Sequence, residues 1–338
     1  MIQIDTLKLA LPLSKCRPDE RLFTQSKGYS NRFYCSAPFG FGQIYINTHQ
    51  KTVVMEMSAK MLKDAYHESI NLSNFTQISK SVSDCVSVTD ETLYNHAKVL
   101  RCDVVNNIDV SDYGCSKREI INTIGVLKSH SDYTLDIYDK TNNNGIVLRG
   151  MYSTVRERTI LYDKQLDLNR TKNKKFIQSL NNPDAMKSVF SNVVRIESNI
   201  ASAKRLKSKL NIPDVYLGSV LSSCEDVNYH NITKICNHKL NIVIDLSDYL
   251  YNQFNNIFTK NDIRGYIELF KYCNYDSSLV QQTLSIENNW TKQQKYYYWT
   301  RQGIKNLFFA AKLKNEMGIV SNGCEIFTKF LSDLRKVA

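Results

Sequence analysis

The sequence predicts an α+β fold in which helices flank a central antiparallel sheet and a mainly helical C-terminal domain follows. Apolar and polar residues alternate with the period of a strand through much of the first 212 residues. The run Asn-Asn-Asn-Gly at 142–145 is typical of a tight hairpin between neighbouring strands. Beyond residue 213 the apolar residues recur with mostly helical spacing. We therefore predict two domains, residues 1–212 and residues 213–338.

The individual elements follow from local patterns. In the strand 98–106, Leu100, Cys102 and Val104 should share one face, with Arg101 and Asp103 on the other. The predicted strands are 1–13, 32–36, 42–47, 52–57, 98–106, 134–138, 146–152, 158–164 and 193–200. The predicted helices are 58–66, 75–86, one after the capping-box pattern at 116–119, one starting at Pro183, 204–210, 214–221, 246–258, 260–272 and 291–317.

Composition restricts the class of protein. The chain has 338 residues, of which 42% are hydrophobic and 23% charged, as expected for a globular protein with a sizeable core. No run of about 18 apolar residues is present, so we expect no membrane span. Asp5 and Lys8 interrupt the apolar start, which favours a first strand over a signal peptide. Nine cysteines without a Cys-x-x-Cys motif indicate reduced thiols and a cytoplasmic location.

Positive charge is concentrated in one segment of the chain. The formal net charge is +11, and residues 158–209 contain twelve Lys or Arg against four Asp or Glu, a local excess of eight. Such a field favours nucleic acid as the partner, although an ordinary solvated surface remains the alternative for any single lysine. The residues that we expect to contact DNA are Arg101, Arg158, Lys172, Lys174, Lys175, Arg195, Lys204, Arg205 and Lys207.

The strand 158–164, Arg-Thr-Ile-Leu-Tyr-Asp-Lys, contains a candidate nucleophile. Tyr162 and Lys164 should point to the same side of an extended strand. A neighbouring ammonium group favours formation of a phenolate and can contact phosphate oxygens. The pattern therefore predicts that Tyr162 and Lys164 act in phosphodiester cleavage.

Two other strands carry an Arg-x-acid pattern, namely Arg101-Cys102-Asp103 and Arg195-Ile196-Glu197, and a third strand contains Glu56. If these strands share a sheet with residues 158–164, their polar faces would bring carboxylates, a tyrosine and a lysine together. Carboxylate oxygens suit Mg²⁺ or Mn²⁺, so Asp103, Glu197 and Glu56 are the candidate metal ligands. For each strand alone, a surface ion pair is the competing interpretation.

Five segments resemble the gene II/gene X replication-initiation proteins of filamentous phages and, more distantly, the initiators of rolling-circle plasmids. These segments are MIQIDTLKLALPL at the start, VVMEMSAKMLKDAYHE at 53–68, VLRCDVV at 99–105, RTILYDKQLDL at 158–168 and VVRIESNIASAKRLKSKLNIP at 193–213. They occur in the order that the family has and span about residues 1–215. Each motif is short, so the resemblance depends on their order and spacing.

The resemblance implies an HUH-endonuclease-like sheet in a catalytic domain of residues 1–212. It implies a rolling-circle initiator that nicks origin DNA through Tyr162, keeps the 5′ phosphate as a phosphotyrosine and later rejoins the strand. Asp103 and Glu197, with Glu56 as a further candidate, would hold the metal, and Lys164 would act on the phosphate or leaving group. Double- and single-stranded origin DNA, a host helicase and a host polymerase are the implied partners, in the bacterial host cytosol.

The chain departs from the wider nuclease class because it has no His-hydrophobic-His motif. Tyr138, which also begins a Tyr-Asp-Lys triplet, and Tyr152 are alternative nucleophiles. A non-catalytic, basic DNA-binding protein is the alternative from a different class. Within the enzyme class, a plasmid initiator or mobilisation relaxase also fits.

The segment Lys292–Arg301 of the C-terminal domain interleaves cations with aromatic residues. Aromatic rings can stack on unpaired bases while cations follow phosphates, so DNA binding is one interpretation. The other is an amphipathic helix whose Tyr297, Ile304, Phe308 and Ala311 pack into a core.

Overall fold

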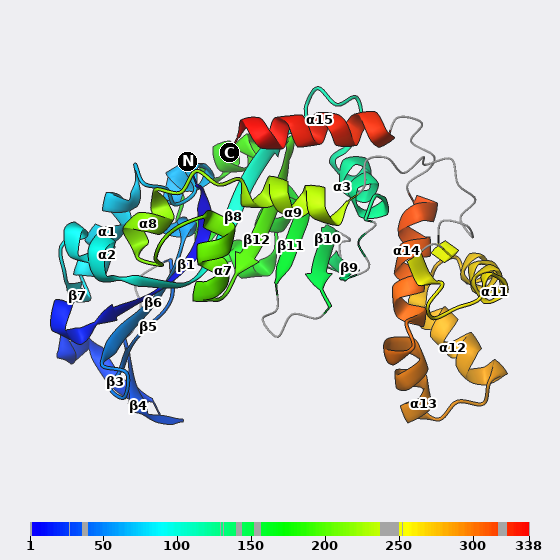
Figure 1. The fold of residues 1–338 in the computed structure, drawn as a ribbon, viewed down its shortest axis with the longest axis horizontal. Coiled ribbons are helices and arrows are strands. Elements are labelled where there is room, and N and C mark those ends of the chain that lie inside the picture. The colour runs from blue at the N-terminus through cyan, green and yellow to red at the C-terminus, as the bar shows by residue number, and fades with distance from the viewer. Residues whose placement is uncertain are drawn as a thin grey trace.

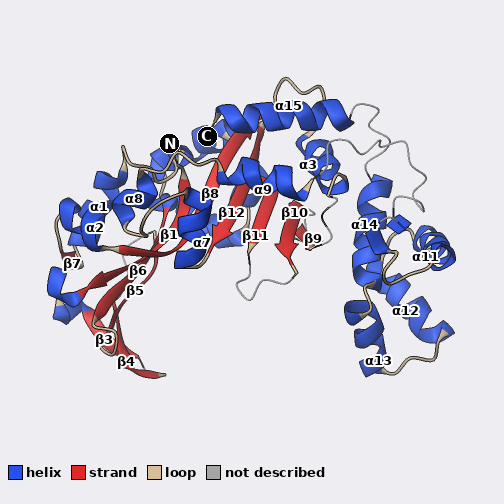
Figure 2. Ribbon diagram, viewed as in Figure 1, coloured by secondary structure: helices blue, strands red, loops and turns tan. Residues whose placement is uncertain are grey.

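The computed structural model describes residues 2–26, 28–35, 40–128, 130, 132–139, 144–151, 157–236, 250–251, 253–316 and 323–337. Within this part of the chain, ten strands form one antiparallel sheet and two short strands form another. Helices pack around the large sheet, and a helical unit follows it (Figure 1, Figure 2). The predicted α+β class with a central antiparallel sheet is confirmed.

The large sheet runs, from edge to edge, β3 (Phe23–Ser26), β4 (Tyr29–Cys35), β5 (Phe41–Asn47), β6 (Thr52–Ser58), β1 (Ile4–Pro12), β8 (Lys98–Asp109), β12 (Val193–Ile200), β11 (Arg158–Asp163), β10 (Gly145–Gly150) and β9 (Tyr133–Tyr138). The small sheet pairs β2 (Arg17–Pro18) with β7 (Val86–Ser87). β12 therefore lies between β8 and β11, so the three strands with the candidate motifs are direct neighbours.

The described α-helices are α1 (Phe75–Ser83), α2 (Asp90–His96), α3 (Lys117–Val126), α4 (Lys164–Leu168), α5 (Lys174–Gln178), α6 (Pro183–Val189), α7 (Ala203–Leu210), α8 (Leu217–Leu221), α9 (Val227–Ile235), α11 (Lys260–Tyr272), α12 (Ser277–Glu287), α13 (Lys292–Tyr296), α14 (Ile304–Glu316) and α15 (Gly323–Lys336). Four 3₁₀ helices are η1 (Leu13–Lys15), η2 (Glu20–Leu22), η3 (Ala59–Glu68) and η4 (Thr171–Asn173), and the described π-helix is η5 (Tyr297–Arg301). None of the described helices is both long and apolar enough to cross a membrane.

Alternation along β12 separates the two faces of the sheet. Val194 and Ile196 are buried in one hydrophobic cluster with residues of α3, α9 and α15. Arg195 and Glu197 alternate with these two residues along β12. They lie on the opposite face of the sheet because successive strand residues point in opposite directions. Figure 1 shows α9 and α15 across the strands on the apolar side. The other face is left for polar groups.

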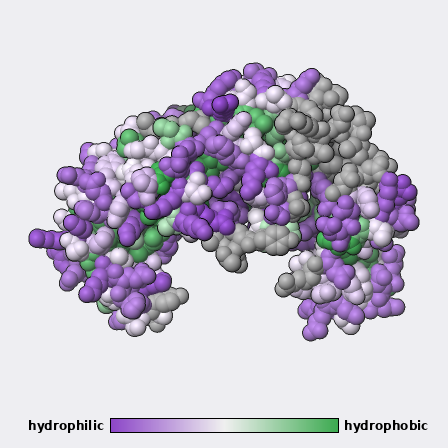
Figure 3. Space-filling model, in the orientation of Figure 1, coloured by the Kyte–Doolittle hydropathy of each residue, from purple (hydrophilic) through white to green (hydrophobic). Residues whose placement is uncertain are grey.

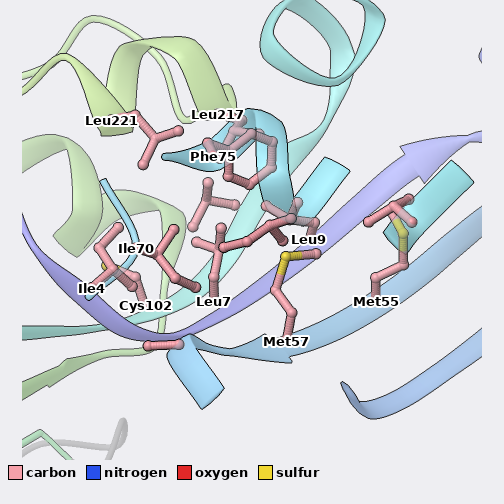
Figure 4. Close-up of a cluster of buried hydrophobic side chains, with 14 of the residues drawn as sticks. Ile4, Leu7, Leu9, Met55, Met57, Ile70, Phe75, Cys102, Leu217 and Leu221 are labelled. Carbon is pink, nitrogen blue, oxygen red and sulfur yellow. The ribbon is translucent and has the colours of Figure 1, made fainter. Parts of the chain in front are cut away.

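The other half of the sheet has its own core. Leu7 and Leu9 of β1 and Met55 and Met57 of β6 are fully buried, and Phe75 of α1 is fully buried in the same cluster (Figure 4). Full burial of a side chain of this size stabilises the fold by about 1.5–3 kcal/mol. The surface of the face shown in Figure 3 is largely hydrophilic, as expected when most large apolar groups lie inside.

The C-terminal segment does not pack as one unit. Leu217 and Leu221 of α8, Ile232 of α9 and Phe327 and Phe330 of α15 join the clusters on the sheet. Most of the buried residues of a third cluster come from α11, α12 and α14, and this cluster contacts the sheet domain through Val126 and Ile137. The packing of the described residues therefore does not follow the expected division at residue 212. Of the predicted helix 246–258, residues 246–249 and 252 lie outside the described residues, and residues 250–251 and 253–254 are helical.

Two local predictions were wrong. Leu100 is 40% exposed, because Lys8 pairs with Arg101 while Leu9 pairs with Val99, so Leu100 is an extra residue in a β-bulge. The strand predicted for residues 158–164 ends at Asp163. The Asp163 side chain accepts a hydrogen bond from the Leu166 amide and caps α4, which begins at Lys164.

We predict that Gly145→Ala lowers the free energy of unfolding by about 2–3 kcal/mol, because overpacking a tight site forces the backbone apart. A Cβ atom at residue 145 would lie 2.7 Å from Cβ and 2.8 Å from Cα of Tyr162 on the paired strand. Urea denaturation measures the change.

Gly265→Ala is the matched control for this substitution. A Cβ atom at residue 265 meets nothing within 4 Å, and the residue lies inside α11. Alanine should therefore raise the free energy of unfolding by roughly 0.5–1 kcal/mol. Equal urea midpoints for Gly145→Ala and the parent chain would contradict the predicted clash.

Candidate active site on the polar face of the sheet

A cavity of about 470 Å³ opens on the polar face of the sheet. The predicted catalytic residues Tyr162 and Lys164 and the predicted ligands Glu56, Asp103 and Glu197 all line it. The remaining charged or phenolic residues of its wall are Asp5, Lys60, Tyr66, Arg101, Tyr138, Arg158, Asp167, Arg170 and Lys172. The structure thus brings the sequence-predicted groups of four strands together, although their chemical roles stay predictions.

The Tyr162 hydroxyl lies between a carboxylate and an ammonium group. It donates a hydrogen bond to Glu197 Oε2 at 3.2 Å and accepts one from Lys164 Nζ at 3.4 Å. Tyr162 is 2% exposed and Lys164 is 3% exposed. A hydroxyl with a base on one side and a cation on the other has the arrangement of an activated nucleophile.

Lys164 reaches this position from the first turn of α4 rather than from a strand. Its ammonium group forms an ion pair of 3.2 Å with Asp167 Oδ2, three residues further along the helix. Asp167 also pairs with Lys172 at 3.0 Å and with Arg170 at 3.4 Å, and it accepts a hydrogen bond from the Tyr138 hydroxyl. One buried carboxylate therefore holds three cations at the edge of the cavity.

A second buried network lies on the other side of Tyr162. Arg195 is fully buried and donates from Nη1 to Asp5 at 2.9 Å and to the Tyr66 hydroxyl at 3.1 Å. Its Nε donates to Asn107 at 2.8 Å, and Tyr66 donates to Asp5 at 2.9 Å. Removing one partner of such a buried charge is strongly destabilising, so these contacts fix β12 against β1 and η3.

Burial and neighbouring charges shift the titration of the site. Burial, reinforced by Asp5 and Asp103, raises the pKa of Glu197 to about 7. Burial, together with the adjacent Glu197 carboxylate, raises the pKa of Tyr162 well above its usual value of 10. Burial, together with Arg195, lowers the pKa of Lys164. Near neutral pH, Glu197 can therefore exchange a proton, whereas Tyr162 stays protonated until a base accepts its proton.

The candidate metal ligands have other partners. Asp103 pairs with Arg101 at 2.6 Å and accepts a hydrogen bond from Asn199. Glu56 pairs with Lys8 at 3.4 Å. Across the described ranges, no three His, Cys, Asp or Glu side chains gather as a group that could hold a metal ion. Glu56, Asp103 and Glu197 share one cavity but do not form a ready ligand set.

The predicted DNA-contacting residues separate into four groups: cavity residues, α5 residues, α7 residues and the buried Arg195. Arg101, Arg158 and Lys172 line the cavity, and Lys174 and Lys175 are exposed on α5, which starts directly after η4.

Lys204, Arg205 and Lys207 belong to α7, which lies beside α9 on the apolar side of the sheet (Figure 1). These cations are therefore on the opposite face from Tyr162. Direct DNA contact by Arg195 was a wrong prediction, because its side chain has no exposed area and is held by Asp5, Tyr66 and Asn107.

Tyr138 remains a competitor of Tyr162 in position. Its ring centroid lies 4.8 Å from that of Tyr162, and its hydroxyl contacts Asp167 and Lys172. Burial and Asp167 raise its pKa as well. Tyr152, the third tyrosine considered, lies outside the described residues.

Sequence reasoning missed Asp5, Tyr66 and Asp167. Asp5 carried a usable signal, since it is an acid within the apolar first strand. Tyr66 and Asp167 are ordinary surface residues by pattern and become part of the site only through η3 and α4. Among known proteins, no family model matches this chain and no curated protein gives a significant match.

We predict that Asp167→Asn lowers the free energy of unfolding at pH 7 by about 3 kcal/mol, because it leaves the buried Lys164 without its carboxylate. Burial alone raises the pKa of Asp167, but Lys164 and Lys172 lower it below the ordinary 3.8. Its stabilising contribution is thus present above pH 3.8 and is lost as the pH falls below that value.

Urea denaturation at pH 7 tests this prediction against a surface pair. Asp112 pairs with Lys329 at 3.0 Å, and its side chain is 74% exposed. Asp112→Asn should change the free energy of unfolding by less than about 0.5 kcal/mol. Equal effects of the two substitutions would show that the Lys164–Asp167 pair contributes no more than a surface pair.

Proposed function

We propose that this chain is a DNA-nicking and DNA-joining enzyme that initiates rolling-circle replication, with Tyr162 as the nucleophile. The single observation that carries the proposal is the position of the Tyr162 hydroxyl, 3.2 Å from Glu197 and 3.4 Å from Lys164 in a cavity lined by six Lys or Arg and five Asp or Glu side chains. The order and spacing of the motifs in residues 1–215 supply the class of reaction. The proposed fold family is the HUH-endonuclease-like sheet.

The proposed cleavage step uses three side chains. Glu197, as the carboxylate, accepts the proton of Tyr162 while the phenolic oxygen attacks the phosphorus atom. A bond forms between the tyrosine oxygen and phosphorus, and the bond from phosphorus to the 3′ oxygen breaks. Lys164 supplies the proton for the departing 3′ oxygen. The products are a 5′-phosphotyrosine and a free 3′ hydroxyl.

Rejoining is the reverse of this step. A 3′ hydroxyl gives its proton to Lys164 and attacks the phosphotyrosine, the bond between phosphorus and the tyrosine oxygen breaks, and the tyrosine leaves with a proton from Glu197. The phosphodiester is exchanged for a phosphotyrosine of similar energy, so joining needs no nucleotide cofactor. Glu197 suits both directions because its pKa of about 7 lets it accept and return a proton near neutral pH.

The requirement for Mg²⁺ or Mn²⁺ is a separate part of the proposal. The carboxylates in the cavity do not fit a metal site as they stand, since Glu56 and Asp103 are already paired with cations. We therefore assign no step of the reaction to a metal ion. Activity after chelation, with Mg²⁺ or Mn²⁺ added back, tests the requirement directly.

The proposed partners are origin DNA in double- and single-stranded form and a host helicase and polymerase in the bacterial cytosol. Arg158, Lys172, Lys174 and Lys175 lie in or next to the wall of the cavity and are the residues that we propose for contact with the DNA backbone. A plasmid initiator or a relaxase would use the same chemistry. The proposal therefore specifies the nicking and joining reaction but does not specify whether the replicated DNA belongs to a phage or to a plasmid.

We predict that Tyr162→Phe abolishes nicking, with a loss of at least about 10³-fold, because phenylalanine offers no oxygen to attack phosphorus. The substrate is a supercoiled plasmid carrying the DNA that flanks the gene, with Mg²⁺ or Mn²⁺ present. Gel electrophoresis measures the nicked circle, and labelled 5′ ends report the covalent protein adduct.

Tyr138→Phe is the matched control, since its ring packs against that of Tyr162 and its hydroxyl also lies in the cavity. This variant should nick and form the adduct. Loss of the adduct in Tyr138→Phe with retention in Tyr162→Phe would move the nucleophile to Tyr138. DNA binding by the parent chain without any nick or adduct would leave the non-catalytic DNA-binding protein.

We predict that the nicking rate rises about tenfold per pH unit below pH 7 and then levels, because only ionised Glu197 accepts the proton. The rate should fall again at alkaline pH as Lys164, whose pKa is lowered by burial and Arg195, loses its proton. Glu197→Gln should slow nicking and remove the acidic limb. A Glu197→Gln profile that keeps this limb would assign it to another group.

A further inference from the structure

We propose that the surface formed by Trp290, Tyr296, Tyr297, Tyr298, Lys292 and Lys295, hereafter the aromatic surface, binds one unpaired DNA strand by base stacking. This surface belongs to the helical unit and contains none of the residues of the candidate active site. The proposed function enters only in the choice of DNA as the nucleic acid.

Aromatic rings of the helical unit remain at the surface instead of entering its core. Tyr296 is 62% exposed and Tyr297 is 51% exposed, whereas Trp299, Ile304 and Phe308 are buried. The prediction that Tyr297 packs into the core was therefore wrong, although it was right for Ile304, Phe308 and Ala311. Single exposed apolar residues are ordinary, but adjacent exposed aromatic residues such as Tyr296 and Tyr297 mark a candidate interaction site.

The rings are held in an ordered arrangement. Trp290 and Tyr298 stack with their ring centroids 4.7 Å apart and an angle of 17° between the ring planes. Tyr297 meets Tyr298 edge to face at 5.4 Å and 80°. Trp290 and Tyr298 are partly buried against the core of the helical unit, which fixes these two rings from below. Rings that are already held in place bind bases at a low cost in conformational entropy.

The backbone is irregular at the same place. The helix that starts at Lys292 continues through Tyr296 as an α-helix and then becomes the π-helix Tyr297–Arg301 before α14 begins. Single π turns inside helices are rare and occur often at functional sites. Here the π turn contains both the exposed Tyr297 and the buried Trp299, and Trp299 anchors the turn in the core.

The charge on this segment matches a polyanion. Residues 288–315 contain six Lys or Arg and no Asp or Glu. Lys292 is exposed and Lys295 is partly so, and neither forms a salt bridge with another residue in the part of the chain that the structure describes. Cations beside stacked rings are what single-stranded nucleic acid requires, because the rings take the bases while the lysines follow the phosphates.

The test uses the full-length chain and a fluorescent oligothymidylate of about 20 nucleotides, which forms no duplex and exceeds the usual site size of such surfaces. Fluorescence anisotropy gives the dissociation constant. The double variant Tyr296→Ala with Tyr297→Ala should bind at least about fivefold more weakly, since stacking on each ring is lost. The matched variant Tyr296→Phe with Tyr297→Phe keeps the rings and should bind like the parent chain.

Two further measurements separate stacking from a general effect of charge or folding. Lys292→Gln with Lys295→Gln should reduce the slope of log affinity against log salt by about 1.4, because two phosphate contacts are lost. Tyr272→Ala, which removes an 81% exposed tyrosine outside this segment, should leave the affinity unchanged.

Equal affinities of the alanine double variant and the parent chain would overturn the proposal, as would tighter binding to an RNA strand of the same length. A failure here is distinguishable from a failure of the proposed nicking reaction. The anisotropy assay requires no cleavage, so the loss of affinity in the alanine double variant is measurable whether or not the parent chain nicks DNA.

Discussion

The burial of charge on one face of the sheet is the constraint on which the site depends. Arg195 has no exposed area, and the rings of Tyr66 and Phe190 flank its guanidinium group at 5.2 and 5.3 Å. A guanidinium group in such surroundings needs an anion and several acceptors to offset the loss of water. Asp5, Asn107 and Tyr66 provide them from β1, β8 and η3. The same contacts align the strands that carry the rest of the cavity.

The strand register transmits this constraint to the candidate nucleophile. Tyr162 of β11 pairs directly with Arg195 of β12, and Ile160 pairs with Glu197. The Tyr162 side chain therefore stands beside the buried guanidinium group, and its hydroxyl reaches the carboxylate two residues further along β12. A shift of one residue in this pairing would turn Tyr162 to the apolar face, where α3, α9 and α15 pack. Register and buried charge thus specify the same arrangement.

Period-two alternation made much of this arrangement predictable from the sequence. It identified the strands of Asp103, Tyr162 and Glu197 and the faces that their side chains occupy, and the capping box at Ser116 marked the start of α3. The bulge at Leu100 was not predictable, because it is set by pairing with β1, which lies about 90 residues earlier in the chain. The packing of α15 against the sheet was not predictable either. The sequence of an amphipathic helix does not show which apolar surface the helix covers.

The raised pKa of Tyr162 does not oppose its proposed role once the charges are followed through the reaction. A free phenolate in this cavity would add a negative charge beside Glu197, which is why burial and that carboxylate keep the phenol protonated. Transfer of the proton to Glu197 adds no charge, because it moves one negative charge across a hydrogen bond of 3.2 Å. The charge arrives at the oxygen that Lys164 already contacts at 3.4 Å. The site thus disfavours a free Tyr162 phenolate. It permits ionisation of Tyr162 when proton transfer to Glu197 is coupled to attack on phosphorus.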